Sequence, residues 1–313
     1  MPTLLLSHPA CLKHDTGPGH PERPDRLRAV EKALADPRFN PLTRAEAPMA
    51  ATATLELVHP AAYIDFIRNA EPAAGSPPVR VDSDTVMSHG SFEAALRAAG
   101  GAIEAVDQVM SGKHANAFVL TRPPGHHCGF ETVEGFCLFS NAAIAAKHAR
   151  AKHGAERVAV VDFDVHHGNG TQAIFWDEKN LFYASTHQMP LYPGTGDKRE
   201  TGAFGNVCNA PLRAGNGGSE MRDAFNSRVF PELRNFGFDL LIISAGFDAH
   251  RDDPLGGLTW VEDDFYWVTR KLIDLAHEKA GGRVVSVLEG GYDLDGLAAS
   301  AAAHVGVLME VAE

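Results

Sequence analysis

Short apolar runs alternate with longer amphipathic segments along this chain. Runs of this length, rich in Val, Ile, Leu and Phe, predict strands that are buried on both faces of a sheet. The predicted strands cover residues 3–7, 116–120, 157–162, 181–185, 239–244 and 283–288.

Segments with Ala, Leu and amphipathic spacing predict the helices. Strands that alternate with helices build a mostly parallel sheet with helices on both faces, so the pattern predicts an α/β fold. The predicted helices cover residues 22–35, 60–70, 89–112, 138–153, 170–177, 217–235, 261–280 and 294–310.

The predicted strand at 157–162 continues into the sequence DFDVHHGNG (162–170). Side chains alternate along a strand, so Asp162, Asp164 and His166 would share one face. Uncompensated charges at the end of a buried strand are costly, and a divalent cation would offset them. Ligands of open parallel sheets bind beyond the carboxyl ends of the strands. The segment therefore predicts a metal site, with a solvated turn as the alternative.

A second apolar strand, within FDLLIISAGFD (238–248), also ends in Gly and Asp. Asp164, His166 and Asp248 would then form an Asp₂His set with an open coordination position, which is typical of a catalytic zinc. The oxygen-rich set would also accept Fe(II), Mn or Co. Asp248 could alternatively cap the helix that follows it.

Two further strands end in residues suited to catalysis. The strand at 116–120 leads to RPPGHH (122–127), and the imidazoles of His126 and His127 suit acid–base chemistry because they titrate near neutral pH. The strand at 283–288 leads to EGGY (289–292). The glycines let the backbone bend, so that the hydroxyl of Tyr292 can point at a developing oxyanion.

Composition is that of a soluble globular protein, with 44% hydrophobic and 22% charged residues. We expect one domain over residues 1–313, no transmembrane helix and no signal peptide. A net charge of −12 disfavours contact with nucleic acid or anionic membranes and is compatible with a cationic substrate. The four cysteines lack a metal or disulfide spacing, which predicts reduced thiols in a cytoplasmic protein; they are residues 11, 128, 137 and 208.

Eight segments in this order resemble the histone deacetylase superfamily, which includes histone deacetylase-like amidohydrolases and acetylpolyamine amidohydrolases. Three of them, HPERP, VDSDT and HHGNG, are similar to its class II branch. The resemblance spans nearly the whole chain and implies the three-layer α/β/α arginase/deacetylase fold with about eight strands. The segments are HPERPDRL (20–27), VDSDT (81–85), RPPGHH (122–127), GFCLFSN (135–141), VDFDVHHGNG (161–170), YPGTG (192–196), SAGFDAHRDDPLGG (244–257) and LEGGYD (288–293).

The resemblance implies a zinc-dependent hydrolase of N-acyl amides, such as acetyl-lysine, with one Zn²⁺ on Asp164, His166 and Asp248. It implies that His127 is the general base and then the acid, with Asn169 as its partner where many relatives have aspartate. His126 would stay closer to the cationic state, oriented by Asp162. Tyr292 would donate to the oxyanion.

Other implied roles concern substrate and a structural K⁺ or Na⁺ ion. Phe136 and Tyr192 match the walls of the family's acyl-lysine tunnel, and Asp82 or Asp84 matches a rim segment that holds the substrate backbone. Leu255 stands where a polyamine-selective relative has an acidic residue. Arg26 matches a position near an internal acetate pocket, although it could also be a helix-surface arginine. The monovalent cation would bind at Asp162, Asp164, His166, Ser185 and Thr186.

Several alternatives stay open at this point. The natural substrate could be a protein acetyl-lysine, an acetylpolyamine or another small amide. An arginase-like two-metal hydrolase would need a further carboxylate where the sequence has Asn169. A binding protein for acylated ligands would not need His126, His127 and Tyr292. A homo-oligomer is compatible with the sequence.

Overall fold

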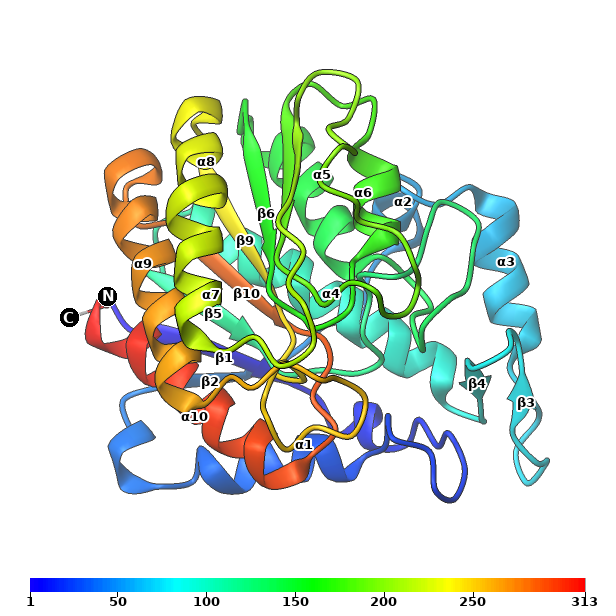
Figure 1. The fold of residues 1–313 in the computed structure, drawn as a ribbon. Helices are drawn as coiled ribbons and strands as arrows, with labels where there is room; N and C mark the ends of the chain where they lie inside the picture. Colours follow the sequence, from blue (N-terminus) through cyan, green and yellow to red (C-terminus); the bar gives the residue numbers. More distant parts are fainter. Residues whose placement is uncertain (313) are drawn as a thin grey trace.

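Eight parallel strands form one sheet in the computed structural model, which describes residues 1–312 (Figure 1). Their order is β2-β1-β5-β10-β9-β6-β7-β8. The α/β class and the size of the sheet are therefore confirmed. The strands are β1 Thr3–Ser7, β2 Thr43–Glu46, β5 Asn116–Val119, β6 Val158–Asp162, β7 Leu181–Ser185, β8 Val207–Asn209, β9 Leu240–Ala245 and β10 Val284–Leu288.

Helices cover both faces of this sheet, and a short antiparallel hairpin of β3 (Val79–Arg80) and β4 (Val86–Met87) lies apart from it (Figure 1). The α-helices are α1 Asp25–Ala33, α2 Thr52–Leu55, α3 Ala61–Ala70, α4 Ser91–Met110, α5 Asn141–His153, α6 Asn169–Phe175, α7 Gly218–Ala224, α8 Phe230–Phe236, α9 Glu262–Ala280 and α10 Leu294–Glu310. Two 3₁₀ turns, η1 (Pro9–Leu12) and η2 (Pro37–Phe39), and a π-helical turn, η3 (Phe225–Val229), complete the chain.

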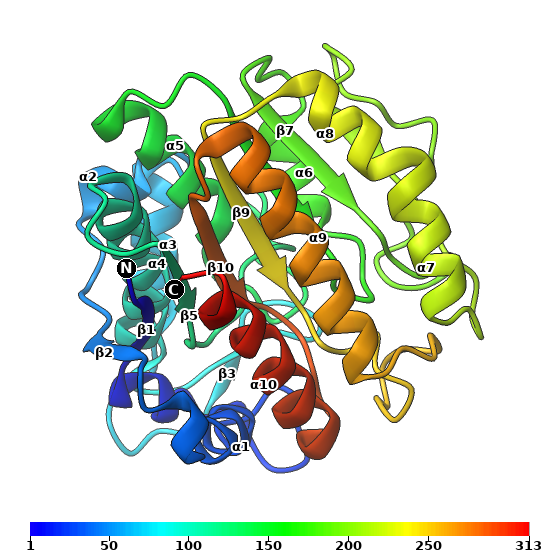
Figure 2. The ribbon, with the colours of Figure 1, turned by 90° about the vertical axis from the view of Figure 1, so that its left-hand side faces the viewer.

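The alternation of side chains along the strands divides the core into two layers. Val160 and Ile242 belong to the apolar layer that includes residues of α3 to α6 on one face. Val161 and Ile243, one residue further along, belong to the layer that includes residues of α1 and α7 to α10 on the other. Figure 2 shows α9 and α10 lying across that second face. Burial on both faces explains why these strands are apolar throughout.

The structure differs from the predicted elements at polar and very short segments. The sequence pattern missed β2 (TRAE) and β8 (VCN), because an exposed edge strand needs no apolar run and three residues show no periodicity. The predicted helix 217–235 is α7 and α8 joined by η3. The helix predicted from residue 22 begins at Asp25, directly after Pro24. Within the described residues, no helix is long and apolar enough to cross a membrane.

The connection between β5 and β6 creates the crevice for the site. The chain leaves β5, passes through α5 on one face and enters β6, and so skips two positions in the sheet. β9 and β10 later fill these positions, and their connecting helix α9 lies on the opposite face. Ligands of doubly wound sheets bind at such a change of direction, beyond the carboxyl ends of the strands.

Candidate active site

Three potential metal ligands converge beyond β6 and β9. Nδ1 of His166 lies 3.0 Å from Oδ1 of Asp164 and 3.1 Å from Oδ2 of Asp248. Their ligand atoms all lie within 4.8 Å of one another, and all three residues are buried. β6 ends at Asp162, so Asp164 and His166 reach the site from the bend after the strand and not from a strand face. The prediction that Asp162, Asp164 and His166 share one face of a strand is therefore wrong for Asp164 and His166, which lie beyond the end of β6.

The second oxygen of each carboxylate is held by the backbone. Oδ2 of Asp164 accepts a hydrogen bond from the Gly290 N–H at 2.8 Å, and Oδ1 of Asp248 accepts one from the Val165 N–H at 2.8 Å. A Cβ on Gly290 would lie 2.2 Å from Oδ2 of Asp248, so only glycine lets the backbone come this close. Such outer contacts fix the orientation of metal ligands.

The electrostatics of this cluster favour a bound cation. Burial and the charge of Asp164 raise the pKa of Asp248 to about 7. Burial would lower the pKa of His166, but the two carboxylates outweigh it and raise the pKa to about 10. The buried carboxylates of Asp164 and Asp248 both face Nδ1 of His166. A divalent ion at the same place would satisfy both carboxylates, so the donor set fits a zinc-type ion.

His126 faces two buried carboxylates. Its Nδ1 lies 2.9 Å from Oδ2 of Asp162, and its Nε2 lies 3.7 Å from Oδ2 of Asp164. Burial lowers the pKa of His126, but the negative charges of Asp164 and Asp162 more than offset this and hold the pKa well above its usual value. The Tyr183 hydroxyl also donates to Asp162, at 3.0 Å, and fixes that carboxylate.

His127 instead contacts the side-chain amide of Asn169. The carboxylate of Glu134, on the other side of this amide, determines the tautomer of His127. The Asn169 Nδ2 donates to Oε2 of Glu134 at 2.8 Å. Glu134 as a carboxylate only accepts, so Asn169 must turn its oxygen towards His127, whose Nδ1 lies 2.8 Å away. Nδ1 therefore carries the hydrogen, and Nε2 of a neutral His127 keeps a lone pair. Burial and the charge of His126 hold the pKa of His127 well below its usual value.

Tyr292 is held in place from two sides. Its backbone N–H donates to Oδ2 of the buried Asp253 at 2.6 Å. The guanidinium of Arg26 donates to the Gly291 carbonyl at 2.6 Å and lies 4.9 Å from the centre of the Tyr292 ring. Burial raises the pKa of the Tyr292 hydroxyl well above its usual value, so the hydroxyl stays a donor. Arg26 is fully buried, so its reading as a helix-surface residue is wrong.

A cavity of about 210 Å³ opens onto His166, His127 and Tyr292. The ring of Phe136 packs edge-on against that of Tyr292, with centroids 5.9 Å apart. The ring of Tyr192 packs edge-on against that of His127 at 5.2 Å. The lining residues are Asp84, His127, Gly135, Phe136, His166, Leu191, Tyr192, Leu255 and Tyr292.

The remaining predicted residues lie at the rim or behind the site. Asp84 and Leu255 line the cavity, whereas Asp82, in the β3–β4 turn, is not among its lining residues. Ser185 pairs in register with Asp162 on the neighbouring strand, and Thr186 follows it. The buried Thr186 hydroxyl has no hydrogen-bond partner among the described residues, so it could accept a cation.

The family model described as "Histone deacetylase domain" matches residues 20–308. The chain belongs to the histone deacetylase family. The chain is 38% identical to "Histone deacetylase-like amidohydrolase" of Pseudomonas aeruginosa, over 93% of this chain and 81% of that protein. It is 40% identical to "Uncharacterized protein slr0245" of Synechocystis sp., over 92% and 93% of the two chains.

A solved structure of the family has the same fold. The "Crystal Structure of HDA15 HD domain" superposes with a TM-score of 0.93 at 37% identity and covers 99% of this chain and 90% of that one. Membership of the histone deacetylase family, inferred from the motifs, is thereby confirmed. This places the chain among hydrolases whose relatives are named deacetylases and amidohydrolases.

Sequence reasoning missed several residues that shape this deacetylase-family site. Glu134 belongs to none of the recognised motifs, although it lies directly before GFCLFSN. Gly135 has a φ of 56°, and a Cβ there would lie 2.2 Å from Cδ2 of His127. Asp253 is part of a recognised motif, but its contact with the Tyr292 backbone joins two distant segments. The motif gave no signal of that contact.

Proposed function

We propose that this protein is a zinc-dependent hydrolase of N-acyl amines, with acetyl-lysine or a related acetylated amine as substrate. One observation carries the proposal: the Asp₂His cluster lies beside a narrow cavity that His127 and Tyr292 also line. A metal, a base and an oxyanion donor around one small cavity suit hydrolysis of a linear amide.

Asp164, His166 and Asp248 would hold one Zn²⁺. Two buried carboxylates and one imidazole suit this ion, with at least one position left for water or substrate. When bound, the ion supplies a Lewis acid that polarises an amide carbonyl and makes water a stronger acid.

His127 would be the general base. The hydrogen on Nδ1 is engaged with Asn169, so the lone pair on Nε2 is available to take a proton from the attacking water. The same Nε2 would then return the proton to the leaving amine. The lowered pKa of His127 keeps it neutral, as a base must be. The neutral Asn169 stabilises the imidazolium less than a carboxylate would.

His126 and Tyr292 would stabilise negative charge. Asp162 is not one of the metal ligands, so its carboxylate still holds His126 in the cationic state when a dication offsets Asp164. The protonated Tyr292 hydroxyl would donate to the oxyanion that forms from the carbonyl. The roles of His126 and Tyr292 are electrostatic and involve no proton loss.

The cavity suggests how the acyl group is chosen. A volume of about 210 Å³ between Phe136, Tyr192 and Leu255 accommodates a short acyl group on a linear alkyl amine. Asp84 at the rim could accept from a substrate N–H or attract a cationic amine. The carboxylate of Asp84 is compatible with an acetylpolyamine as an alternative substrate, although Leu255, which also lines the cavity, supplies no charge there. The arginase-like alternative is disfavoured because Asn169 is engaged with His127 and Glu134.

A monovalent cation, K⁺ or Na⁺, is proposed at Asp162, Asp164, His166, Ser185 and Thr186. The unpartnered Thr186 hydroxyl supports this position. Cytoplasmic location and homo-oligomerisation stay predictions, and the four buried, free cysteines are compatible with a reducing compartment.

The test uses enzyme stripped of metal and reloaded with one Zn²⁺ per chain. Turnover of an acetyl-lysine amide and of an acetylpolyamine, measured side by side, would establish the reaction and rank the two substrate classes. Binding of both without turnover would favour an acyl-ligand binder and contradict the proposed hydrolase.

A further inference from the structure

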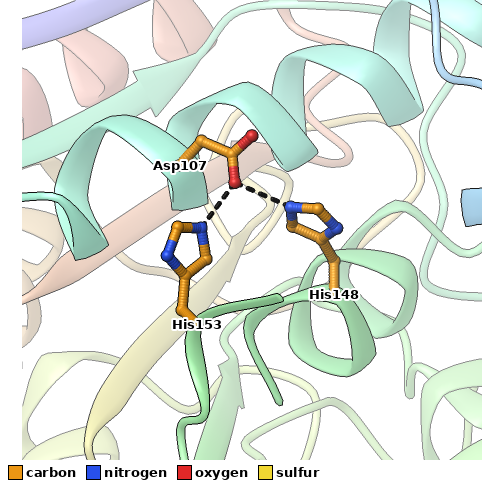
Figure 3. A group of neighbouring side chains, drawn as sticks. All are labelled: Asp107, His148 and His153. Carbon is orange, nitrogen blue, oxygen red and sulfur yellow. Dashed lines mark hydrogen bonds and ion pairs between the residues drawn. The ribbon is translucent and has the colours of Figure 1, made fainter. Parts of the chain in front are cut away.

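A second cluster of metal-type ligands lies between α4 and α5 (Figure 3). Asp107 near the end of α4 points at two histidines of α5. Its Oδ1 lies 2.7 Å from Nε2 of His148 and 2.6 Å from Nε2 of His153. The packing of α4 against α5 brings these residues together from two separate segments of the chain. None of the three takes part in the proposed hydrolysis.

We propose that Asp107, His148 and His153 form a second divalent-metal site, for an ion of the Zn²⁺ class. Two imidazole nitrogens and one carboxylate oxygen are donors that Zn²⁺, Ni²⁺ and Cu²⁺ prefer, whereas Mg²⁺ and Ca²⁺ prefer oxygen alone. Each Nε2 now shares a hydrogen with Asp107. On metal binding, that hydrogen moves from Nε2 to Nδ1 of a neutral ring, and the freed lone pair of Nε2 becomes the ligand.

The geometry needs only a small adjustment. Zinc lies about 2.0–2.2 Å from nitrogen and oxygen ligands, so ligands of one ion are about 3 Å apart or more. The present separations of 2.6 and 2.7 Å would open slightly. The side chains are 35%, 11% and 19% exposed for Asp107, His148 and His153, which permits this movement and leaves room for water to complete the coordination.

The surroundings favour a cation at this point. α4 ends at Met110 and α5 ends at His153, so both helices direct their partially negative carboxyl ends towards the cluster. Of the three Lys and Arg residues of α5, Lys152 is exposed to solvent. The other two, Lys147 and Arg150, pair with Glu178 at 2.8 and 3.8 Å. They therefore offset the charge of Glu178 rather than that of Asp107.

The cluster is remote from the catalytic residues. α5 begins at Asn141, whose side chain donates to the Pro123 carbonyl in the loop that carries His126. His153 lies at the other end of α5, about 18 Å away at a rise of 1.5 Å per residue. An ion here would join the ends of α4 and α5 and stabilise the folded state, because only the folded chain presents all three ligands.

The experiment measures bound zinc in holoenzyme that already carries its first equivalent. Holoenzyme is dialysed against buffered Zn²⁺ alone, and bound metal is counted by atomic spectrometry. We expect a second equivalent in the unaltered protein and its loss in Asp107→Asn and in His148→Gln. The melting temperature should rise with free zinc in the unaltered protein and respond less in both variants.

The matched control is His89→Gln. His89 is an exposed histidine whose ring nitrogen lies 3.5 Å from Glu71, and within the described residues this pair belongs to no group of three potential metal ligands. This variant should keep the second equivalent, and Mg²⁺ at the same concentration should not replace it. Turnover of an acetyl-lysine amide should be unchanged in Asp107→Asn.

Three results would overturn the second site. They are a single equivalent in the unaltered protein, a second equivalent that survives both cluster variants, and equal binding of Mg²⁺. The first two would identify the cluster as a hydrogen-bonded contact between helices. Because these counts are independent of turnover, they leave the proposed hydrolase untouched.

Discussion

Oδ1 of Asn169 lies 2.8 Å from Nδ1 of His127, so this histidine has a neutral partner. Its neighbour His126 instead faces the carboxylate of Asp162. The two adjacent histidines therefore differ in charge: the pKa of His126 is raised, and that of His127 is lowered. The amide of Asn169 suits His127 to the role of a neutral base, and the carboxylate of Asp162 suits His126 to that of a cation.

Asn169→Asp should raise the pKa of His127, because an anionic partner favours the imidazolium. The acidic limb of kcat/KM, where the base becomes protonated, should then move to higher pH. A pH profile measured at constant metal content tests this. If the limb stays in place, His127 and Asn169 do not act together as proposed.

Glu134 should act on His127 through Asn169, as a positioning residue. Glu134→Ala frees the Asn169 amide to turn and should lower kcat/KM by about 10-fold or more, as loss of an outer contact commonly does. Glu134→Gln keeps a carbonyl acceptor for Asn169 and should retain more activity than the Ala variant. Equal losses in both variants would indicate that only the charge of Glu134 matters.

His127→Ala should be more damaging than His126→Ala over the whole pH range. The first change removes the proton carrier, whereas the second removes a positive charge and leaves the base, the metal and Tyr292. Rates of both variants, each with measured zinc content, decide the order. A larger loss in His126→Ala would reverse the assignment of the two roles.

Tyr292→Phe should reduce kcat by about 10²-fold or more and leave zinc binding intact, since one oxyanion donor is lost. Tyr266→Phe is the control, because Tyr266 is an exposed tyrosine whose hydroxyl donates to Glu310 at 3.1 Å. It should behave like the unaltered enzyme. An effect of Tyr292→Phe on KM alone would assign Tyr292 to substrate binding.

Asp248→Ala should lose the catalytic zinc and the activity together. It should also lose the rise in melting temperature that the first zinc equivalent gives, because metal that binds only the folded state stabilises it. Asp252→Ala, which removes a carboxylate that is 63% exposed, should change none of these. Full retention of the first equivalent in Asp248→Ala would contradict the ligand assignment.

Local sequence was sufficient to identify the fold class, the family and the groups that end the central strands. Buried parallel strands are apolar throughout, so the polar residues that follow β5, β6, β9 and β10 stand out in the sequence. Because the strands are parallel, their carboxyl ends and the residues that follow them lie at the same edge of the sheet. Asp164, His166, Asp248, His127 and Tyr292 could thus be selected before their distances were known.

Tertiary structure alone decided the contacts between segments that lack such a pattern. Glu134 and Asn169 are distant in sequence, and only the loop before α5 brings them together. Arg26 is buried beneath Tyr292, although its helix has the pattern of a surface helix. His148 and His153 are five residues apart, which is not the spacing of one helix face, and they need Asp107 from another helix. Periodicity reports which face of an element is buried, but not which residues of other elements meet it there.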